Sequence, residues 1–285
     1  MKRLLVVALL SVLVWAPQMA QAQSLDFGGG SDGAPLSIDA KGGIEWNQPA
    51  QLFIAAGPAK ATRGDMVLDA DELRAHYRSS KKSSNEVYLL DAIGNVRIAS
   101  PGRIATGGIA TYDVDKSVIV LKDGNPVTLT SGANVITAKG QLEFWDKRQL
   151  AVARGNAEVI SAGKRIKADV LTAHFETNAA GKTTLGRVEA FDNVVISTAT
   201  EQVFADRAAY NVPTGLARLT GSVKIKRGNN VINGCSADID LNTGISRMNS
   251  CEGGSVSGTT GDSNAGSSNT GSDRVHGVLT PMKKK

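Results

Sequence analysis

The chain has 285 residues, with 32 Lys or Arg and 27 Asp or Glu, so its formal charge is +5. The surplus lies at the ends: without Lys2, Arg3 and the terminal Lys283 to Lys285, 27 basic residues balance 27 acidic ones. A nearly neutral body argues against nucleic acid as a partner. Composition alone leaves enzymes and binding proteins as alternatives.

Residues 1–22 predict a secretory signal peptide. Lys2-Arg3 supplies the positive start, and Leu4 to Trp15 is an apolar segment too short to span a bilayer comfortably. Ala20-Gln21-Ala22 matches a cleavage site, so we expect the mature chain to begin at Gln23. The alternative is an uncleaved membrane anchor. Residues 23–33, rich in Gly and Asp, are expected to form a flexible lead-in.

Residues 34–249 alternate short runs of Val, Ile, Leu and Thr with Gly, Asn, Asp or Pro, a pattern typical of strands and turns. A small residue followed by a large one recurs about every 30 residues. The pairs are Ala70 and Tyr77, Gly107 and Tyr112, Ala138 and Phe144, Ala168 and Phe175, Ala205 and Tyr210, and Gly234 and Ile239. Between them, a second landmark such as Gly94-Asn95-Val96 begins a new run. Such a period predicts stacked antiparallel β-meander units.

Within this region, residues 102–127 show the unit most clearly. We expect a bend at Gly107-Gly108, made possible by positive φ angles, and then a strand from Ile109 to Val114. Alternation places Ala110, Tyr112 and Val114 on one face of that strand. Residues 69–77 have helical propensity, but their place in the repeat predicts a strand. The polar stretches 78–85 and 177–184 are expected to be exposed loops.

Cys235 and Cys251 are the two cysteines of the chain. The alternatives are a disulfide, which we favour, and two free thiols. A disulfide would stabilise an exported protein by about 3 kcal/mol in the chain-entropy model. Residues 250–273 are rich in Gly, Ser, Thr and Asn and predict a disordered linker. Residues 274–285 form a short C-terminal motif with a basic tail, either a docking strand or a frayed end.

No motif indicates catalysis. His76 and His174 occupy equivalent positions in two repeats, and repeated Asp residues such as Asp169 and Asp206 follow the small-residue position. The chain lacks C-x-x-C, H-E-x-x-H, G-x-S-x-G and P-loop motifs. We therefore expect no enzyme activity, no metal site and no cofactor.

The order and spacing of several motifs resemble the OstA-like LptA family. They are Pro35 to Ala40, Thr62 to Leu73 with His76-Tyr77, Ala110 to Val114 with Val118 to Leu121, Gly155-Asn156-Ala157 with Lys167-Ala168-Asp169, and Arg274 to Pro281. The resemblance implies an all-β fold, an elongated, twisted, open β-jellyroll with an apolar interior. Residues 34–162 would form this jellyroll, and 163–249 a continuation or a second half, because the chain is longer than a short family member.

The resemblance also implies a function. Such a protein would bind lipopolysaccharide in the periplasm, shield the lipid A acyl chains in an apolar groove, and bridge the inner and outer membranes. Its expected partners are the inner-membrane and outer-membrane components of the export machinery and further copies of itself, joined head to tail. The positions that match lipid-contacting residues of the family are Leu36, Ile38, Ile98, Tyr112 and Val114. The alternatives are a structural or adhesive β-repeat protein and the related inner-membrane-anchored component.

Overall fold

A computed structural model describes residues 37–79, 86–161, 163–177, 183–240, 242–243, 245–251 and 276–278. The predicted signal peptide and lead-in lie outside these ranges, as do Leu36, most of the two predicted loops, nearly all of the predicted linker and the basic tail. Within the described ranges, no helix is long and apolar enough to cross a membrane.

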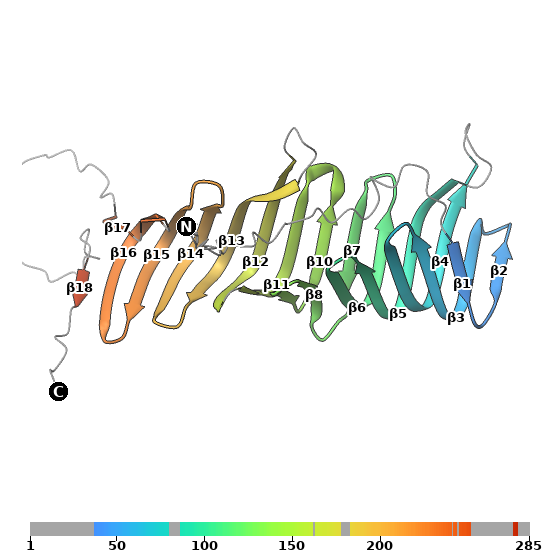
Figure 1. Ribbon diagram of the computed structural model, residues 1–285, viewed down its shortest axis with the longest axis horizontal. Helices are drawn as coiled ribbons and strands as arrows, with labels where there is room; N and C mark the ends of the chain where they lie inside the picture. The colour runs from blue at the N-terminus through green and yellow to red at the C-terminus, as the bar shows by residue number, and fades with distance from the viewer. Residues whose placement is uncertain are drawn as a thin grey trace, which may run out of the picture.

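The described residues form one antiparallel sheet whose strands lie side by side along the long axis (Figure 1). A short 3-10 turn, η1 (Asp146–Arg148), interrupts it. The strands are β1 (Ser37–Ala40), β2 (Ile44–Asn47), β3 (Leu52–Arg63), β4 (Met66–Arg78), β5 (Glu86–Ser100), β6 (Arg103–Asp113), β7 (Val118–Lys122), β8 (Val127–Ser131), β9 (Asn134–Ala138), β10 (Gln141–Trp145), β11 (Leu150–Ser161), β12 (Lys164–Thr177), β13 (Thr183–Ser197), β14 (Glu201–Asn211), β15 (Leu216–Arg227), β16 (Asn230–Asp240), β17 (Ile245–Asn249) and β18 (His276–Val278). The all-β prediction is confirmed, and residues 69–77 belong to strand β4.

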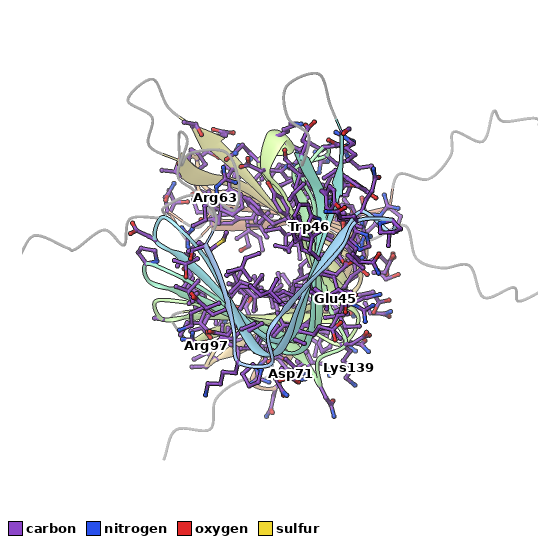
Figure 2. The ribbon with its side chains drawn as sticks, turned by 90° about the vertical axis from the view of Figure 1, so that its right-hand side faces the viewer. Glu45, Trp46, Arg63, Asp71, Arg97 and Lys139 are labelled. Atoms are coloured by element: carbon purple, nitrogen blue, oxygen red, sulfur yellow. A yellow bond between two sulfur atoms is a disulfide. The ribbon has the colours of Figure 1, made fainter. Side chains whose placement is uncertain are left out.

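Each long strand contributes to two walls that meet at a corner. For example, β3 pairs with β1 through its second half and with β2 through its first half. Wall 1 consists of the short strands β1, β8, β9 and β18 and of the halves of the long strands that belong to the same run of paired strands. Wall 2 consists of β2, β7, β10 and β17 and of the other halves of the long strands. Viewed along the axis, Asp71 and Lys139 lie at the corner, while Arg63 and Trp46 lie toward the opposite side on different walls (Figure 2). No strand pairing joins the free edges of the two walls in the described residues.

The corner is a line of β-bulges, and these explain the second sequence landmark. Gly94 and Asn95 both have positive φ angles, of 77° and 47°, and the register between β4 and β5 shifts beside them. Two left-handed residues in succession turn a strand sharply, and Gly and Asn tolerate that conformation best. The Asn95 amide also donates a hydrogen bond of 2.8 Å to Asp71 across the corner, and Asn193 makes the same 2.8 Å bond to Asp169.

At Gly107-Gly108 the predicted positive φ angles are wrong. Both residues lie inside the continuous strand β6, and neither is among the residues with positive φ. Their lack of a side chain serves close packing instead. A Cβ atom on Gly107 would lie 2.8 Å from the Leu121 side chain, and one on Gly108 would collide with the backbone of Asp123. Glycine is therefore required because β7 and the turn after it approach β6 closely at the corner.

Candidate functional site

The inner face of wall 1 carries one unbroken apolar row, which we call the wall-1 lane. In each strand of wall 1 except β18, one residue of the lane pairs directly with lane residues of the neighbouring strands. The lane consists of Ile38, Ala61, Leu68, Ile98, Ala105, Leu129, Ile136, Val159, Ile166, Ile196, Val203, Ile225 and Ile232. Because every member is aliphatic, the lane offers a continuous hydrocarbon surface along the sheet.

Wall 2 carries two such rows on its inner face. The wall-2 lane nearer the corner consists of Ile44, Ala55, Leu73, Ala92, Ala110, Leu121, Leu142, Ala153, Leu171, Ala190, Ala208, Leu219, Ala237 and Met248. The outer wall-2 lane consists of Trp46, Phe53, Ala75, Leu90, Tyr112, Ile119, Phe144, Ala151, Ala173, Val188, Tyr210, Ala217 and Ile239. Both walls therefore face the interior with apolar side chains.

These lanes give the small-then-large repeat a structural reason. The small residues, such as Ala138 and Ala205, sit at the corner, where Ala138 pairs with Val127 and Ala205 with Val194. Large residues such as Phe144 and Tyr210 then reach the outer wall-2 lane. The corner is narrow and admits only small or β-branched side chains, whereas the space between the walls widens toward their free edges.

The solvent exposure of the inner side chains also differs between the corner and the space farther out. At the corner the side chains are buried, with Val127 and Ala157 fully inaccessible to solvent. Away from the corner, inner residues such as Ile136, Leu142 and Ile166 pack on this core but remain partly exposed. The interior is thus closed at the corner. Farther out, buried residues such as Ile119 and Phe144 alternate with partly exposed ones, so part of the apolar surface is available to an apolar ligand.

At the β1–β2 end, the interior opens as a cavity of about 410 Å³ between the two walls. It is lined by Ile38, Ile44, Phe53, Ala55, Leu73, Ala75 and Val87. Beside it, the Phe53 ring stacks on Trp46 with centroids 5.3 Å apart and contacts Tyr77 at 5.0 Å. The Trp46 indole nitrogen donates a hydrogen bond of 2.8 Å to the Tyr77 hydroxyl. Such a cavity can accept hydrocarbon but offers few polar groups to orient a polar ligand.

Charged groups are kept out of these lanes. Glu143 is the one buried charged residue that the described part contains, and it alternates with the inward Leu142 and Phe144. Burial alone would raise the pKa of Glu143, but hydrogen bonds from Arg154, Gln141 and Trp145 hold it below its usual value. The carboxylate is therefore satisfied on the outer side of wall 2 and leaves the interior apolar.

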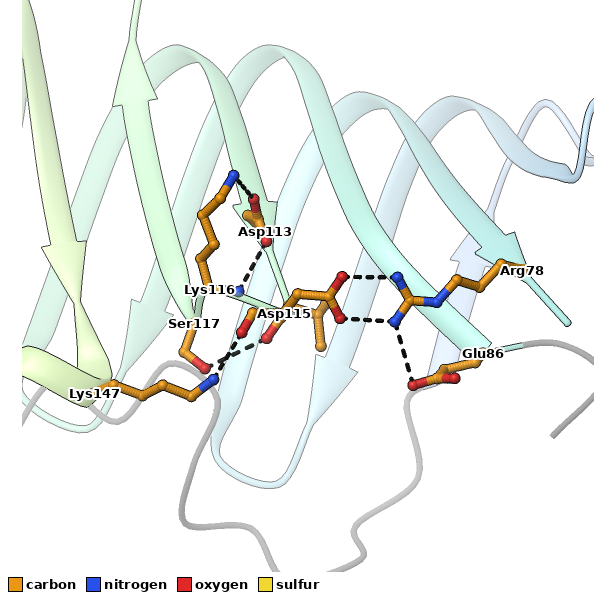
Figure 3. A network of polar contacts seen from close by, with 8 residues as sticks. Arg78, Glu86, Asp113, Asp115, Lys116, Ser117 and Lys147 are labelled. Carbon is orange, nitrogen blue, oxygen red and sulfur yellow. Dashed lines mark hydrogen bonds and ion pairs between the residues drawn. The ribbon is translucent and has the colours of Figure 1, made fainter. Parts of the chain in front are cut away.

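The free edge of wall 2 carries a network of paired charges (Figure 3). Arg78 donates two hydrogen bonds of 2.8 Å to the Asp115 carboxylate, and it lies 3.7 Å from Glu86. Lys116 forms a 2.7 Å ion pair with Asp113, and Lys147 donates to the Asp115 carbonyl at 2.7 Å. The network ties β4 and β5 to the β6–β7 turn and to η1, and its charges neutralise one another.

The structure places four of the five residues that the resemblance singled out. Ile38 lines the cavity and starts the wall-1 lane, and Ile98, only 5% exposed, lies farther along that lane. Tyr112 lies in the outer wall-2 lane. Val114 is not part of the strand, because β6 ends at Asp113 and Val114 begins the following turn. Leu36 lies outside the described residues. Most lane residues, including Leu129 and Val159, were missed, although their period-2 alternation was visible.

Cys235 and Cys251 form a disulfide with their Cα atoms 5.0 Å apart. Cys235 lies at the corner of β16, between the half that pairs with β17 and the half that pairs with β18. The bond therefore fixes the start of the C-terminal segment at the corner. The short strand β18 lies within the predicted C-terminal motif.

An open antiparallel sheet folded around an apolar interior makes this chain an elongated β-jellyroll protein of the OstA-like type. The profile of the LptA/(LptD N-terminal domain) LPS transport proteins matches it twice, over residues 37–140 and 140–245. The chain belongs to this family, as the resemblance implied. The role of the family is transport, which is not an enzymatic one. In the described residues, no three His, Cys, Asp or Glu side chains gather as a metal site requires.

Two relatives show how far the similarity extends. One is an uncharacterized protein of Rhizobium meliloti (strain 1021), 24% identical over 118 residues, or 40% of this chain and 63% of that protein. The chain thus matches less than two thirds of that relative. The other is LptH, the LptA-homologous periplasmic component of the lipopolysaccharide transport device of Pseudomonas aeruginosa. Its crystal structure is 16% identical, with a TM-score of 0.40, over 52% of this chain and 95% of LptH.

Proposed function

We propose that this protein carries lipopolysaccharide across the periplasm, with the lipid A acyl chains lying between its two walls. The observation that supports this most directly is the set of apolar lanes that run along both inner faces. An acyl chain needs an apolar surface without directional hydrogen bonds, and a lane of aliphatic residues lets it slide. A disulfide and a signal-like N-terminus are consistent with an oxidising, exported compartment.

A structural or adhesive β-repeat protein is the second candidate. Such a protein would be expected to bury its inner residues completely, because nothing else would cover them. Here Ile136, Leu142 and Ile166 stay partly exposed on the inner faces, and a cavity opens at one end. These observations favour a carrier.

Photo-crosslinking tests the carrier proposal. A photoreactive phenylalanine at position 112, in the outer wall-2 lane, is expected to capture lipopolysaccharide in cells. The same group at position 104 is the matched control, because Ile104 lies on the same strand and is 40% exposed on the outer side of wall 1. Capture at 112 with little at 104 supports the proposal. Equal capture at both positions, or none at 112, would contradict it.

We further propose that copies join head to tail to bridge the two membranes, together with the inner-membrane and outer-membrane components of the export machinery. The two ends of the sheet present edge strands: β1 and β2 at one end, β17 and β18 at the other. Ile44 and Trp46 are 56% and 51% exposed on β2, and Ile245 is 56% exposed on β17. Exposed edges with apolar side chains are suited to pairing with another strand.

Ile44→Asp is expected to weaken self-association by about 10-fold or more, because it places a charge at the joining edge. Sedimentation velocity over a series of protein concentrations measures this change. Ile104→Asp introduces the same charge away from both ends of the sheet and should leave association unchanged. If the two variants associate equally well, the β2 edge is not the joining surface.

A further inference from the structure

The free edge of wall 1 differs from that of wall 2. One inward position beyond the wall-1 lane, the apolar row gives way to a polar one. Apart from Met66, its members are polar or charged, and the row includes Arg63, Met66, Ser100, Arg103, Ser131, Asn134, Ser161, Lys164, Glu201 and Arg227. Glu201 is its single acidic member, and it pairs with Arg227 at 2.6 Å. The remaining cations, Arg63, Arg103 and Lys164, outnumber Asp65, the acidic residue in the turn between Arg63 and Met66, so this edge has an excess of positive charge.

Arg63 and Arg103 are the notable members, because both are partly buried and neither has a side-chain partner among the residues that the structure describes. Arg63 follows the buried lane residue Ala61 by two positions, and Arg103 precedes the buried lane residue Ala105 by two. Because side chains alternate along a strand, both arginines lie on the inner face of wall 1. In the described part of the chain, no ion pair or side-chain hydrogen bond involves either of them, and the Arg63 Nε atom is buried without an acceptor.

Burial also lowers the pKa of the Arg103 guanidinium. Proteins seldom remove a guanidinium from water without giving it an acceptor, because the lost hydration is costly. The two residues lie three strand spacings apart, on β3 and β6, or about 14 Å. They are therefore two separate donor groups along one edge and not a single cluster.

The free edge of wall 2 is less suited to binding an anionic group than the free edge of wall 1. At the edge of wall 2, Arg78, Lys116 and Lys147 already have partners (Figure 3). The lane beside it is rich in aromatic side chains, among them Phe53 and Phe144. An amphiphile between the walls would thus meet apolar or neutralised surface on one side and free guanidinium groups on the other.

We propose that Arg63 and Arg103 bind phosphate groups on the head of the lipid whose acyl chains lie in the interior. Arginine suits this task because its planar fork of N–H donors matches two phosphate oxygens at once. The head group would then lie along the free edge of wall 1, which sets the orientation of the lipid. This inference rests on the proposed carrier function and adds to it the chemistry of the head group.

Binding of two probes by the purified full chain tests the inference: lipid A and its fully dephosphorylated counterpart. The double variant Arg63→Gln/Arg103→Gln should bind lipid A about 10-fold more weakly or worse, and bind dephosphorylated lipid A as the wild type does. Arg63→Lys/Arg103→Lys should recover part of the loss, because it keeps the charge. Arg97→Gln is the matched control, since Arg97 lies on the outer face of wall 1, 3.6 Å from Asp69. Thermal unfolding confirms that each variant is folded.

The outcomes separate the head-group inference from the carrier proposal. Unchanged lipid A binding by the double variant, or equal losses for both probes, would overturn the role of Arg63 and Arg103 alone. Failure of the wild type to bind either probe would overturn the carrier proposal as well. Inorganic phosphate alone is the third probe: if the wild type binds it as tightly as it binds lipid A, the edge is a site for free phosphate and not for a lipid head group.

Discussion

A carboxylate at position 159 is expected to weaken lipopolysaccharide binding strongly. Val159 lies in the middle of the wall-1 lane, between Ile136 and Ile166, and packs against the core. In Val159→Asp, a charge would interrupt the wall-1 lane, and an acyl chain cannot hydrate it. We expect binding to fall by at least about 10-fold and the free energy of unfolding to fall by about 2–4 kcal/mol.

The neighbouring residue supplies the control. Ile160 follows Val159 on β11 but points to the outer side, where it is exposed. Ile160→Asp introduces the same charge one residue away, and we expect it to change the free energy of unfolding by no more than about 0.5 kcal/mol. Isothermal titration with lipopolysaccharide and chemical unfolding measure both variants. Similar behaviour of the two would mean that the inner face has no special role.

The second large effect concerns stability. Leu219 lies in the wall-2 lane and is 1% exposed, in contact across the sheet with Ala208 and Ala237. Leu219→Ala should lower the free energy of unfolding by about 2–5 kcal/mol, because small alanine neighbours cannot move to fill the space. Urea unfolding followed by far-ultraviolet circular dichroism measures the change.

Leu216 provides the matched substitution on the same strand. It is 52% exposed at the start of β15, so Leu216→Ala removes the same atoms from a solvated site. Its expected cost is below about 0.5 kcal/mol. A small effect at Leu219, comparable with that at Leu216, would show that the two walls do not pack together near the corner.

The two ends of the sheet are built alike but from different parts of the chain. At one end, β1 and β2 follow each other directly and cover the two halves of β3. At the other end, β17 covers one half of β16, and β18, which comes from a distant part of the sequence, covers the other. The Cys235–Cys251 disulfide lies where these halves meet. The edge at the β17–β18 end is thus assembled from two separate segments of the chain, and the disulfide anchors the segment that contains β17.

The sequence itself determined the strand content, the repeat and the Gly-Asn positions that separate the runs. Alternation of apolar residues is a local property, and so is the tolerance of Gly94-Asn95 for positive φ angles. For this reason the strand assignment of residues 69–77 was correct despite their helical propensity, since the repeat outweighed it. The reason for Gly107-Gly108 was missed, because their constraint comes from Leu121 and Asp123 on the next strand and turn.

Only the tertiary structure decided which residues share a surface. Ile38 and Ile225 belong to one lane because the register of successive strand pairs aligns them, although they are far apart in sequence. Likewise, the sequence shows Arg63 and Arg103 only as cations at strand ends, and the folded sheet places both on its inner face. Periodicity specifies which face of a strand a side chain occupies. The bend and the strand register determine what that face encloses, and here they assemble the apolar lanes and the positively charged edge above one of them.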